Sequence, residues 1–600
     1  MLTSIGGLQY LTIAHLGPFH AKQKSSEQMN FSWAKGSLHQ FLFLSVVAVV
    51  GSVLYPLSCD AGGGPENVFL VVNSSSPASL TVANHYIDLR KIPPSNVCFL
   101  KYPPGRASMG GDRFKKVFLE PIIAKIKKRK LTSQIDYIVY SCDFPWRVNF
   151  AKVFPTENFS RQQNPYVSLS SATYLSAFVL ADRKEMFGSN ANFYCSPANN
   201  LVVVSRGFRS SYRWSLGGRR AGADGLPYML SSVLGVNSVP GNTVDEIAWY
   251  LKRSAEADGT KPAGTIYFAK NKTIRSTVRD KEYLQAVAKI QLAGVKAEVI
   301  EGYFPEYKQN VAGVTCGHSL VNPAGSHCRF LPGAFIDNLT SAGGQFLPGK
   351  NQTCLSEFLR MGAAGACGTV VEPFALAPKF PNSTQQVHYV HGCSLAESFY
   401  QSVASPFQQI LVGDPLCQPW AKIPEVSLEG IKENSMVEGK VTITPQVSDI
   451  EEGVADLKLF VDGVLKQQKQ AGQSFQWDTT KIPDGYHELR VVATDNTPIE
   501  TQGRWLGQVI VKNGSDAVQV SVEKDSLAAS STFVNFNVNA TNQDPVALYC
   551  NDIELGKIDN GNGQIAVAKE KLGAGPITLT AISKGKPGMR SRPLRIELTD

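Results

Sequence analysis

The sequence has few charged residues, and they are not gathered in one place. Only 18% of its 600 residues are charged, and the formal net charge is +9. The one dense basic run, residues 115–130, is typical of an amphipathic helix with a solvated basic side. Because a phosphate-binding surface needs more clustered positive charge, this composition argues against nucleic acid as a partner.

Long hydrophobic runs are also scarce, and the one we interpret lies near the N-terminus. Residues 41–57 (FLFLSVVAVVGSVLYPL) follow Lys35 and precede a stretch of small residues that ends at Ala61. This order predicts a secretory signal peptide cleaved near Ala61. An uncleaved N-terminal anchor and a lipidated Cys59 remain alternatives. We therefore expect an exported protein, extracellular or in the cell envelope, with no membrane association beyond such an anchor.

Internal repeats and low-complexity tracts are absent, so the chain is not a repeat array. Its length fits about three to five domains. The predicted boundaries are an N-terminal extension with signal peptide (1–61), a first α/β subdomain (66–225), a second α/β subdomain (226–422), an Ig-like β-sandwich (423–513) and a second β-sandwich (514–600).

The region from residue 66 to Trp420 alternates between strand and helix signals. Residues 67–73 (NVFLVVN) form the unbroken apolar run of a buried parallel strand, and a helix is predicted after Pro77. A second strong helix begins at Thr243, with Glu246 three residues on as its capping-box partner. This order predicts an α/β fold in two subdomains with parallel sheets, and it places ligands at the carboxyl ends of the strands.

Beyond Trp420 the pattern changes to alternating apolar and polar residues. Strand signals separated by tight turns, such as the VDG of residues 461–463, continue to residue 511. Trp477 and Leu489 are the predicted core members. This part resembles a bacterial Ig-like module, and residues 517–598 are predicted to form a second sandwich.

Eleven cysteines occur, and cleavage near Ala61 would leave ten. An even number suits disulfides in an oxidising compartment. Cys316 and Cys328 enclose a loop that also holds His318 and His327, which could suggest zinc. The spacing does not match the usual ligand intervals, so we predict a loop-closing disulfide there and neither a metal nor another cofactor.

Residues 335–420 carry a resemblance to a known family. They contain FIDNLTSAGGQF, the helix signal CLSEFLRMGAAGA, a strand signal GTVVEP and the closing Gly413, Asp414 and Pro415. This segment is similar to the closing half of gingipain-type, caspase-like cysteine peptidases. The resemblance implies a two-subdomain caspase-like region and a hydrolase, such as a cysteine peptidase of gingipain type, as one alternative activity.

The residues that this activity requires are not at the expected positions. Tyr303 and Phe304 stand where the family has its histidine, and residues 340–344 (TSAGG) stand where it has its cysteine. A cysteine peptidase needs a thiolate beside an imidazole. The one pair with suitable order is His318 with Cys354, although Cys354 at the start of a helix is equally typical of a buried structural thiol.

Two further residues are catalytic candidates. Ser341 beside Gly343 and Gly344 could be a nucleophile, but the sequence lacks the G-x-S-x-G elbow, and a turn with positive φ explains the glycines as well. Glu372 follows a strand signal and precedes Pro373, so its carboxylate is predicted to project from the edge of the sheet.

Four other polar residues are pocket candidates because they lie at or just beyond strand and helix ends: Asp337, His388, His391 and Asp414. An ordinary turn or loop role is the alternative for each. His388 and His391 could approach one metal, but no third ligand lies nearby.

Three functions are compatible with these features. The first is an exported, non-catalytic protein that binds an unknown protein or surface ligand. The second is a hydrolase, including a cysteine peptidase of gingipain type. The third is an envelope or adhesion component whose Ig-like tail makes the contact.

Overall fold

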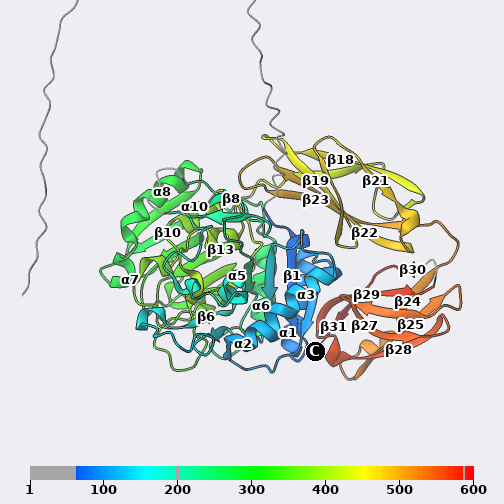
Figure 1. Cartoon of the computed structure of the whole chain (residues 1–600), viewed down its shortest axis with the longest axis horizontal. Coiled ribbons are helices and arrows are strands. Elements are labelled where there is room, and N and C mark those ends of the chain that lie inside the picture. The colour runs from blue at the N-terminus through cyan, green and yellow to red at the C-terminus, as the bar shows by residue number, and fades with distance from the viewer. Residues whose placement is uncertain (1–61, 198–202, 586–587, 600) are drawn as a thin grey trace, which may run out of the picture. The chain divides into compact units, whose positions relative to one another are not determined.

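The structure is a computed structural model of the chain that describes residues 62–197, 203–585 and 588–599 (Figure 1). The predicted signal peptide or anchor and its cleavage site near Ala61 lie outside the described residues. Within the described ranges, no helix is both long enough and apolar enough to cross a membrane.

Ten strands of the described chain form one continuous sheet. In spatial order they are β11 (Lys296–Glu301), β10 (Thr265–Lys270), β12 (Val311–Cys316), β13 (Phe330–Asn338), β14 (Gly365–Thr369), β15 (Gln409–Gly413), β9 (Leu230–Val233), β4 (Tyr137–Tyr140), β1 (Val68–Asn73) and β2 (Val97–Leu100). Every neighbouring pair is parallel except β14 and β15, which are antiparallel. The sheet therefore has two parallel halves whose strands point in opposite directions.

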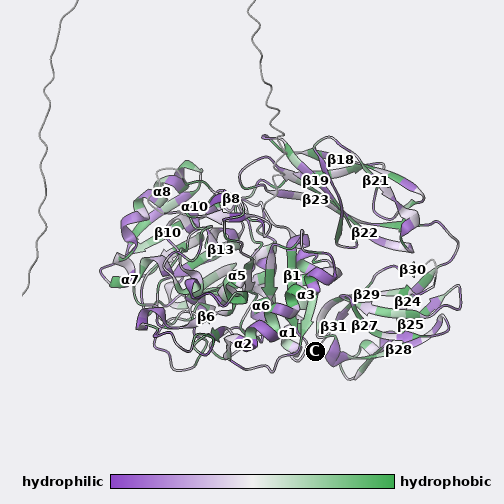
Figure 2. Ribbon diagram, in the orientation of Figure 1, coloured by the Kyte–Doolittle hydropathy of each residue, from purple (hydrophilic) through white to green (hydrophobic). Residues whose placement is uncertain are grey.

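Helices cover this sheet, and the N-termini of α1 and α6 follow the sequence signals. They are α1 (Pro77–Arg90), α2 (Gly111–Phe114), α3 (Glu120–Lys128), α4 (Leu169–Tyr174), α5 (Ser176–Leu180), α6 (Val244–Ala255), α7 (Ile274–Thr277), α8 (Tyr283–Leu292), α9 (Ser356–Arg360), α10 (Thr384–Val390) and α11 (Leu395–Tyr400). Ser76 caps α1 by accepting a hydrogen bond from the Ser79 amide, and Thr243 and Glu246 form the predicted capping box of α6. Figure 2 shows the hydrophobic residues on strands such as β1, whose side chains are buried.

Short strands complete this region in two small sheets. They are β3 (Ser108–Gly110), β5 (Arg147–Asn149) and β6 (Tyr166–Ser168) in one sheet, and β7 (Arg213–Ser215) and β8 (Arg219–Ala221) in the other.

The C-terminal part is all β and has two separate hydrophobic cores. Its first strands are β16 (Glu425–Glu429), β17 (Ser435–Val437), β18 (Lys440–Ser448), β19 (Val454–Val461), β20 (Val464–Gln470), β21 (Phe475–Asp478), β22 (Asp484–Asp495) and β23 (Gln502–Val511). The others are β24 (Val518–Val522), β25 (Phe533–Ala540), β26 (Val546–Cys550), β27 (Ile553–Ile558), β28 (Asn562–Ala568), β29 (Gly575–Ser583), β30 (Met589–Arg590) and β31 (Leu594–Leu598). Trp477 and Leu489 are buried in the first core, as predicted.

The predicted fold class is wrong. Strand residues outnumber helical residues over the described chain, so the class is mostly β rather than α/β. The expected two-subdomain caspase-like region is not found either, because residues from both predicted subdomains contribute strands to the same sheet. The antiparallel contact between β14 and β15 joins the two halves edge to edge.

Several elements near the candidate site also differ from the prediction. β14 begins at Gly365, three residues before the predicted strand, and α9 ends at Arg360. β12 and α10 occupy segments for which the sequence predicts no strand or helix. Small residues such as Gly313 and Gly365 carry little strand signal, and tertiary pairing places them in the sheet.

A buried carboxylate joins the first sandwich to the start of the main sheet. Glu66 is 1% exposed, and its two oxygens meet Arg490 of β22 at 3.3 Å and Arg504 of β23 at 3.1 Å. Gly64 allows this approach, because a Cβ on Gly64 would lie 2.0 Å from a guanidinium nitrogen of Arg504. Burial raises the pKa of Glu66, but the attraction of Arg504 and Arg490 outweighs it and leaves that pKa below its ordinary value.

Glu66→Gln is expected to destabilise the protein by about 3 kcal/mol, because it leaves two arginines without their shared carboxylate. The lowered pKa of Glu66 means that its stabilisation is complete above the ordinary value of 4.5 and is lost as the pH falls through the folded-state value. Urea unfolding from pH 7 to pH 3 should therefore show a steeper acid loss in the wild type than in E66Q. Equal slopes in both proteins would contradict this role.

Candidate functional site

The four predicted catalytic residues lie near one edge of the sheet. Strands β12, β13 and β14 are parallel, so His318, Ser341 and Glu372 all follow strand ends on the same side. The Leu355 amide donates to the Gly343 carbonyl at 2.8 Å, which brings the neighbouring Cys354 to the loop of Ser341. The four residues therefore lie on the same side of the sheet, and a catalytic pair would require a hydrogen bond between two of their side chains.

His318 and Cys354 have separate partners. The His318 Nδ1 lies 2.6 Å from the carbonyl oxygen of Leu320, and its ring stacks on Tyr303 with the ring centroids 3.9 Å apart. Burial raises the pKa of the Cys354 thiol. No hydrogen bond between the two side chains occurs in the described part of the chain. A thiol with a raised pKa and no imidazole partner is a poor nucleophile.

Ser341 belongs to a loop that packs tightly on β14. A Cβ on Gly344 would lie 2.7 Å from the carbonyl oxygen of Gly368, so this glycine is needed for close backbone approach. Neither Gly343 nor Gly344 has a positive φ, so the turn explanation for these glycines is wrong. No imidazole contacts the Ser341 hydroxyl among the described residues.

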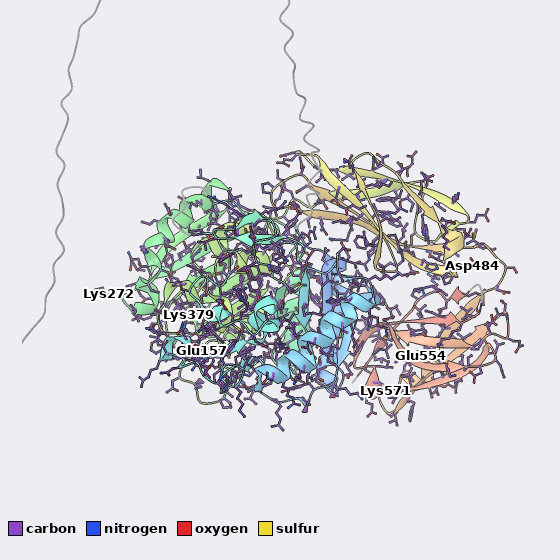
Figure 3. All side chains as sticks on the ribbon, in the orientation of Figure 1. Glu157, Lys272, Lys379, Asp484, Glu554 and Lys571 are labelled. Carbon is purple, nitrogen blue, oxygen red and sulfur yellow. The ribbon has the colours of Figure 1, made fainter. Side chains whose placement is uncertain are left out.

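Glu372 lies beyond the strand rather than at its end. It is exposed, three residues after β14, and its carboxylate accepts a hydrogen bond from the Phe374 amide at 2.9 Å. The nearby buried Lys379, labelled in Figure 3, donates to Gln408 at 2.9 Å and to the Pro373 carbonyl at 3.1 Å. Burial lowers the pKa of Lys379 to about 8, and the charge of Glu372 opposes that shift.

Asp337 is part of a buried ion pair with Arg279. Its other oxygen accepts a hydrogen bond from the Cys367 thiol at 3.3 Å, and Arg279 also donates to the Cys316 carbonyl at 2.6 Å. Burial raises the pKa of Asp337, while Arg279 acts to lower it. These contacts hold β12, β13 and β14 together, so the role of Asp337 is structural.

Asp414 lies at the opposite edge of the sheet, because β15 runs antiparallel to β14. It is fully buried and accepts hydrogen bonds from Arg90 at 2.8 Å and from Tyr86 at 3.0 Å. Arg90 also pairs with Asp258. Asp414 therefore anchors α1 to the end of β15 and does not share a cleft with Asp337.

His388 and His391 converge on a residue that the sequence did not single out. The Ser205 hydroxyl lies 3.0 Å from Nδ1 of His388 and 3.1 Å from Nδ1 of His391. Burial lowers the pKa of His388 to about 3 and also lowers that of His391, so both rings are neutral at pH 7. Among the described residues, no group of three or more His, Cys, Asp or Glu side chains is placed to hold a metal ion.

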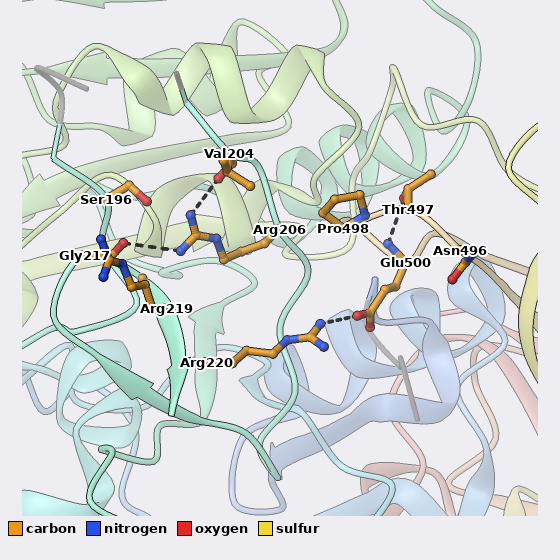
Figure 4. Close-up of a pocket in the computed structure, with 11 residues that line it drawn as sticks. Ser196, Val204, Arg206, Gly217, Arg219, Arg220, Asn496, Thr497, Pro498 and Glu500 are labelled. Carbon is orange, nitrogen blue, oxygen red and sulfur yellow. Dashed lines mark hydrogen bonds and ion pairs between the residues drawn. The ribbon is translucent and has the colours of Figure 1, made fainter. Parts of the chain in front are cut away.

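Beside Ser205 lies a pocket of about 580 Å³ whose described lining carries three arginines and one acid (Figure 4). We call it the arginine pocket, and it is lined by Ser196, Val204, Arg206, Gly217, Gly218, Arg219, Arg220, Asn496, Thr497, Pro498 and Glu500. Arg220 pairs with Glu500 and lies 4.1 Å from the ring centroid of Tyr212.

Arg206 differs from Arg220 because its described hydrogen bonds go to carbonyl oxygens. It donates to Val204 at 3.0 Å and to Gly217 at 3.5 Å. Burial lowers the pKa of Arg206, and the like charge of Arg220 adds to that effect. Without a carboxylate partner in the described chain, Arg206 leaves positive charge at the pocket wall.

Sequence reasoning missed this pocket although a signal was present. Residues 206–220 contain five arginines, a local concentration hidden by the modest net charge of the whole chain. The other wall comes from the turn between β22 and β23, nearly three hundred residues away, and no sequence pattern linked the two segments.

Comparison with known proteins identifies one module. Residues 424–491 match the family described as bacterial Ig domain, which confirms the predicted Ig-like module. The match covers a small part of the chain, so it does not assign the whole protein to a family. A search of curated proteins finds no significant match.

Solved structures give only distant likenesses. The fibronectin(III)-like modules of Clostridium thermocellum CbhA are 13% identical, with 29% of this chain and 92% of theirs covered and a TM-score of 0.14. Parabacteroides merdae beta-glucuronidase is 15% identical over 31% of this chain and 26% of its own, with a TM-score of 0.12. Latent PorU from Porphyromonas gingivalis is 12% identical over 29% and 20%, with a TM-score of 0.13. Such low scores carry no argument about function, including the gingipain resemblance.

Cys354 is expected to react slowly with iodoacetamide in the folded protein at pH 7, because burial raises the pKa of its thiol. Mass spectrometry of tryptic peptides can follow its labelling, with C354S to confirm the assignment. Rapid labelling of Cys354 at pH 6 that is lost in H318Q would instead establish a thiolate paired with His318.

Proposed function

We propose that this protein is an exported binding protein of the cell envelope, and that it holds a small ligand with several negative charges in the arginine pocket. The observation that carries the proposal is the set of three guanidinium groups around one cavity, with Glu500 as the one described acid in its lining. Guanidinium groups bind carboxylates and related anions with paired, charge-assisted hydrogen bonds.

The size of the pocket supports a small molecule or one residue of a polymer. Its volume of about 580 Å³ lies within the usual range of ligand sites. Arg206 and Arg219 offer charge that no described ion pair satisfies, whereas Arg220 is already held by Glu500. A ligand carboxylate would therefore meet Arg206 and Arg219 first.

The Ig-like module supports a role outside the cell and also contributes to the proposed site. Its turn at residues 496–500 forms one wall of the arginine pocket, and the Thr497 hydroxyl accepts from the Glu500 amide at 3.1 Å. In this proposal the module positions the pocket wall as well as extending the protein. An adhesion role would use the same module, with the ligand as part of a larger surface polymer.

Citrate is expected to bind the wild-type protein in isothermal titration calorimetry, and sorbitol, a neutral six-carbon polyol, is not. The variants R206M and R219M should each weaken citrate binding by about tenfold, the loss of one charge-assisted contact. R213M is the matched control, since Arg213 lies in the same arginine-rich stretch but outside the pocket lining. Equal citrate binding by all four proteins would contradict the proposal.

A second candidate function is acyl hydrolysis at Ser205. His391, which lines a second pocket of about 640 Å³, could accept the Ser205 proton at Nδ1, while His388 donates its Nδ1–H to the same oxygen. The Ser205 oxygen would then form an acyl ester with the substrate carbonyl. The leaving alcohol would take the proton from His391, and water would release the acid.

A fluorophosphonate probe tests this chemistry directly because it reacts with activated serine hydroxyls. The hydrolase function predicts labelling of the wild type at Ser205, loss of labelling in S205A and H391Q, and unchanged labelling in S341A. Absence of labelling in the folded wild type would rule out an activated Ser205.

A further inference from the structure

Arg147 is a further arginine that forms no ion pair with a carboxylate within the described chain. It lies on β5, and its guanidinium carbon is 4.7 Å from the Trp146 ring centroid and 4.8 Å from that of Tyr166. No ion pair joins it to a carboxylate in the described ranges. Its one described hydrogen bond is a long contact of 3.5 Å from Nη1 to the carbonyl oxygen of Val370.

Burying the guanidinium of Arg147 without a hydrogen-bond acceptor costs free energy of folding, unless a ligand supplies that acceptor. The Nε atom of Arg147 is buried and has no hydrogen-bond partner. A buried donor without a partner loses its contact with water and gains nothing in return. The two aromatic rings attract the cation, but they accept no hydrogen bonds from its edge. Burial accordingly lowers the pKa of Arg147.

The position of Arg147 places this charge where three segments meet. Val370 directly follows β14, and Trp146 contacts Phe346 with their ring centroids 6.0 Å apart. Phe346 lies in the loop between β13 and α9, and so does Thr340, whose carbonyl accepts a hydrogen bond from the Thr369 hydroxyl at 2.9 Å. The carboxyl ends of parallel strands are the usual ligand sites of such sheets. This is a different place from the arginine pocket, and the two share no lining residue.

We propose that Arg147 is the anchor of a second binding site, which takes a ligand carboxylate at the C-terminal end of β14. A planar carboxylate matches the fork of guanidinium N–H groups, and a planar group also fits beside flat aromatic rings. Trp146 and Tyr166 hold the guanidinium between apolar surfaces, where a charge-assisted hydrogen bond is stronger than in water. Ser341 lies in the adjoining loop and is the polar side chain we expect beside the ligand.

The test uses thermal unfolding of the full chain with two probes of equal shape, acetate and acetamide, at constant ionic strength. Acetate is expected to raise the melting temperature of the wild type more than acetamide does. In R147M that difference should disappear, because the methionine keeps the contact with both rings but has no donor. The difference between acetate and acetamide should be smaller in R147K than in the wild type. It should be unchanged in R206M, which distinguishes this site from the arginine pocket.

The melting temperature without probe provides an independent readout. Replacing a half-buried charge that has no carboxylate partner by an apolar side chain of similar length should leave the melting temperature of R147M unchanged or raise it by about 1 °C or more. A structural arginine would instead cause a loss of several degrees. Such a loss, an acetate effect that survives in R147M, or no acetate effect in the wild type would each overturn the proposal.

Discussion

The carboxylate of Glu66 is the charge on which the architecture depends. It stands just before β1, the first strand of the main sheet, and it meets arginines from two strands of the Ig-like module. Arg490 is itself fully buried and also pairs with Glu488 and with the Lys91 carbonyl. Removing one buried charge from such a group leaves the others without compensation. The module is therefore held to the sheet by electrostatics, and the turn at residues 496–500 that closes the arginine pocket is held with it.

The reversal of strand direction between β14 and β15 decides which residues can act together. Residues that follow β12, β13 and β14 lie at one edge, and Asp414 after β15 lies at the other. Asp337 and Asp414 are both satisfied by buried arginines, so their charges serve the fold. Arg206 and Arg147, in contrast, have no carboxylate partner among the described residues, and both proposed sites rest on that difference.

Local signals predicted the elements well where they were strong. The unbroken run before Asn73 and the capping box of Thr243 and Glu246 gave β1 and α6 nearly to the residue. Trp477 and Leu489 were placed in the correct core because strict alternation fixes which side chains face inward. The strand β12 was not predicted, and the predicted boundaries of α9 and β14 were wrong. The reason is that glycine and alanine by themselves indicate little about secondary structure. The predicted division into two subdomains failed because no local pattern reveals that two runs of parallel strands join into one sheet.

The predicted disulfides are also absent, as the ten described cysteines are all free thiols.

His318, Ser341, Cys354 and Glu372 follow the ends of β12, β13 and β14 on the same side of the sheet, and no hydrogen bond joins any two of these side chains in the described chain. Their catalytic role therefore stays a prediction. The arginine pocket was beyond sequence reasoning because its walls come from distant segments. A crystal structure of the protein soaked in saturating citrate would show whether the arginine pocket binds carboxylates. We expect citrate density in contact with Arg206 and Arg219. A pocket that contains only water under those conditions would contradict the proposed binding.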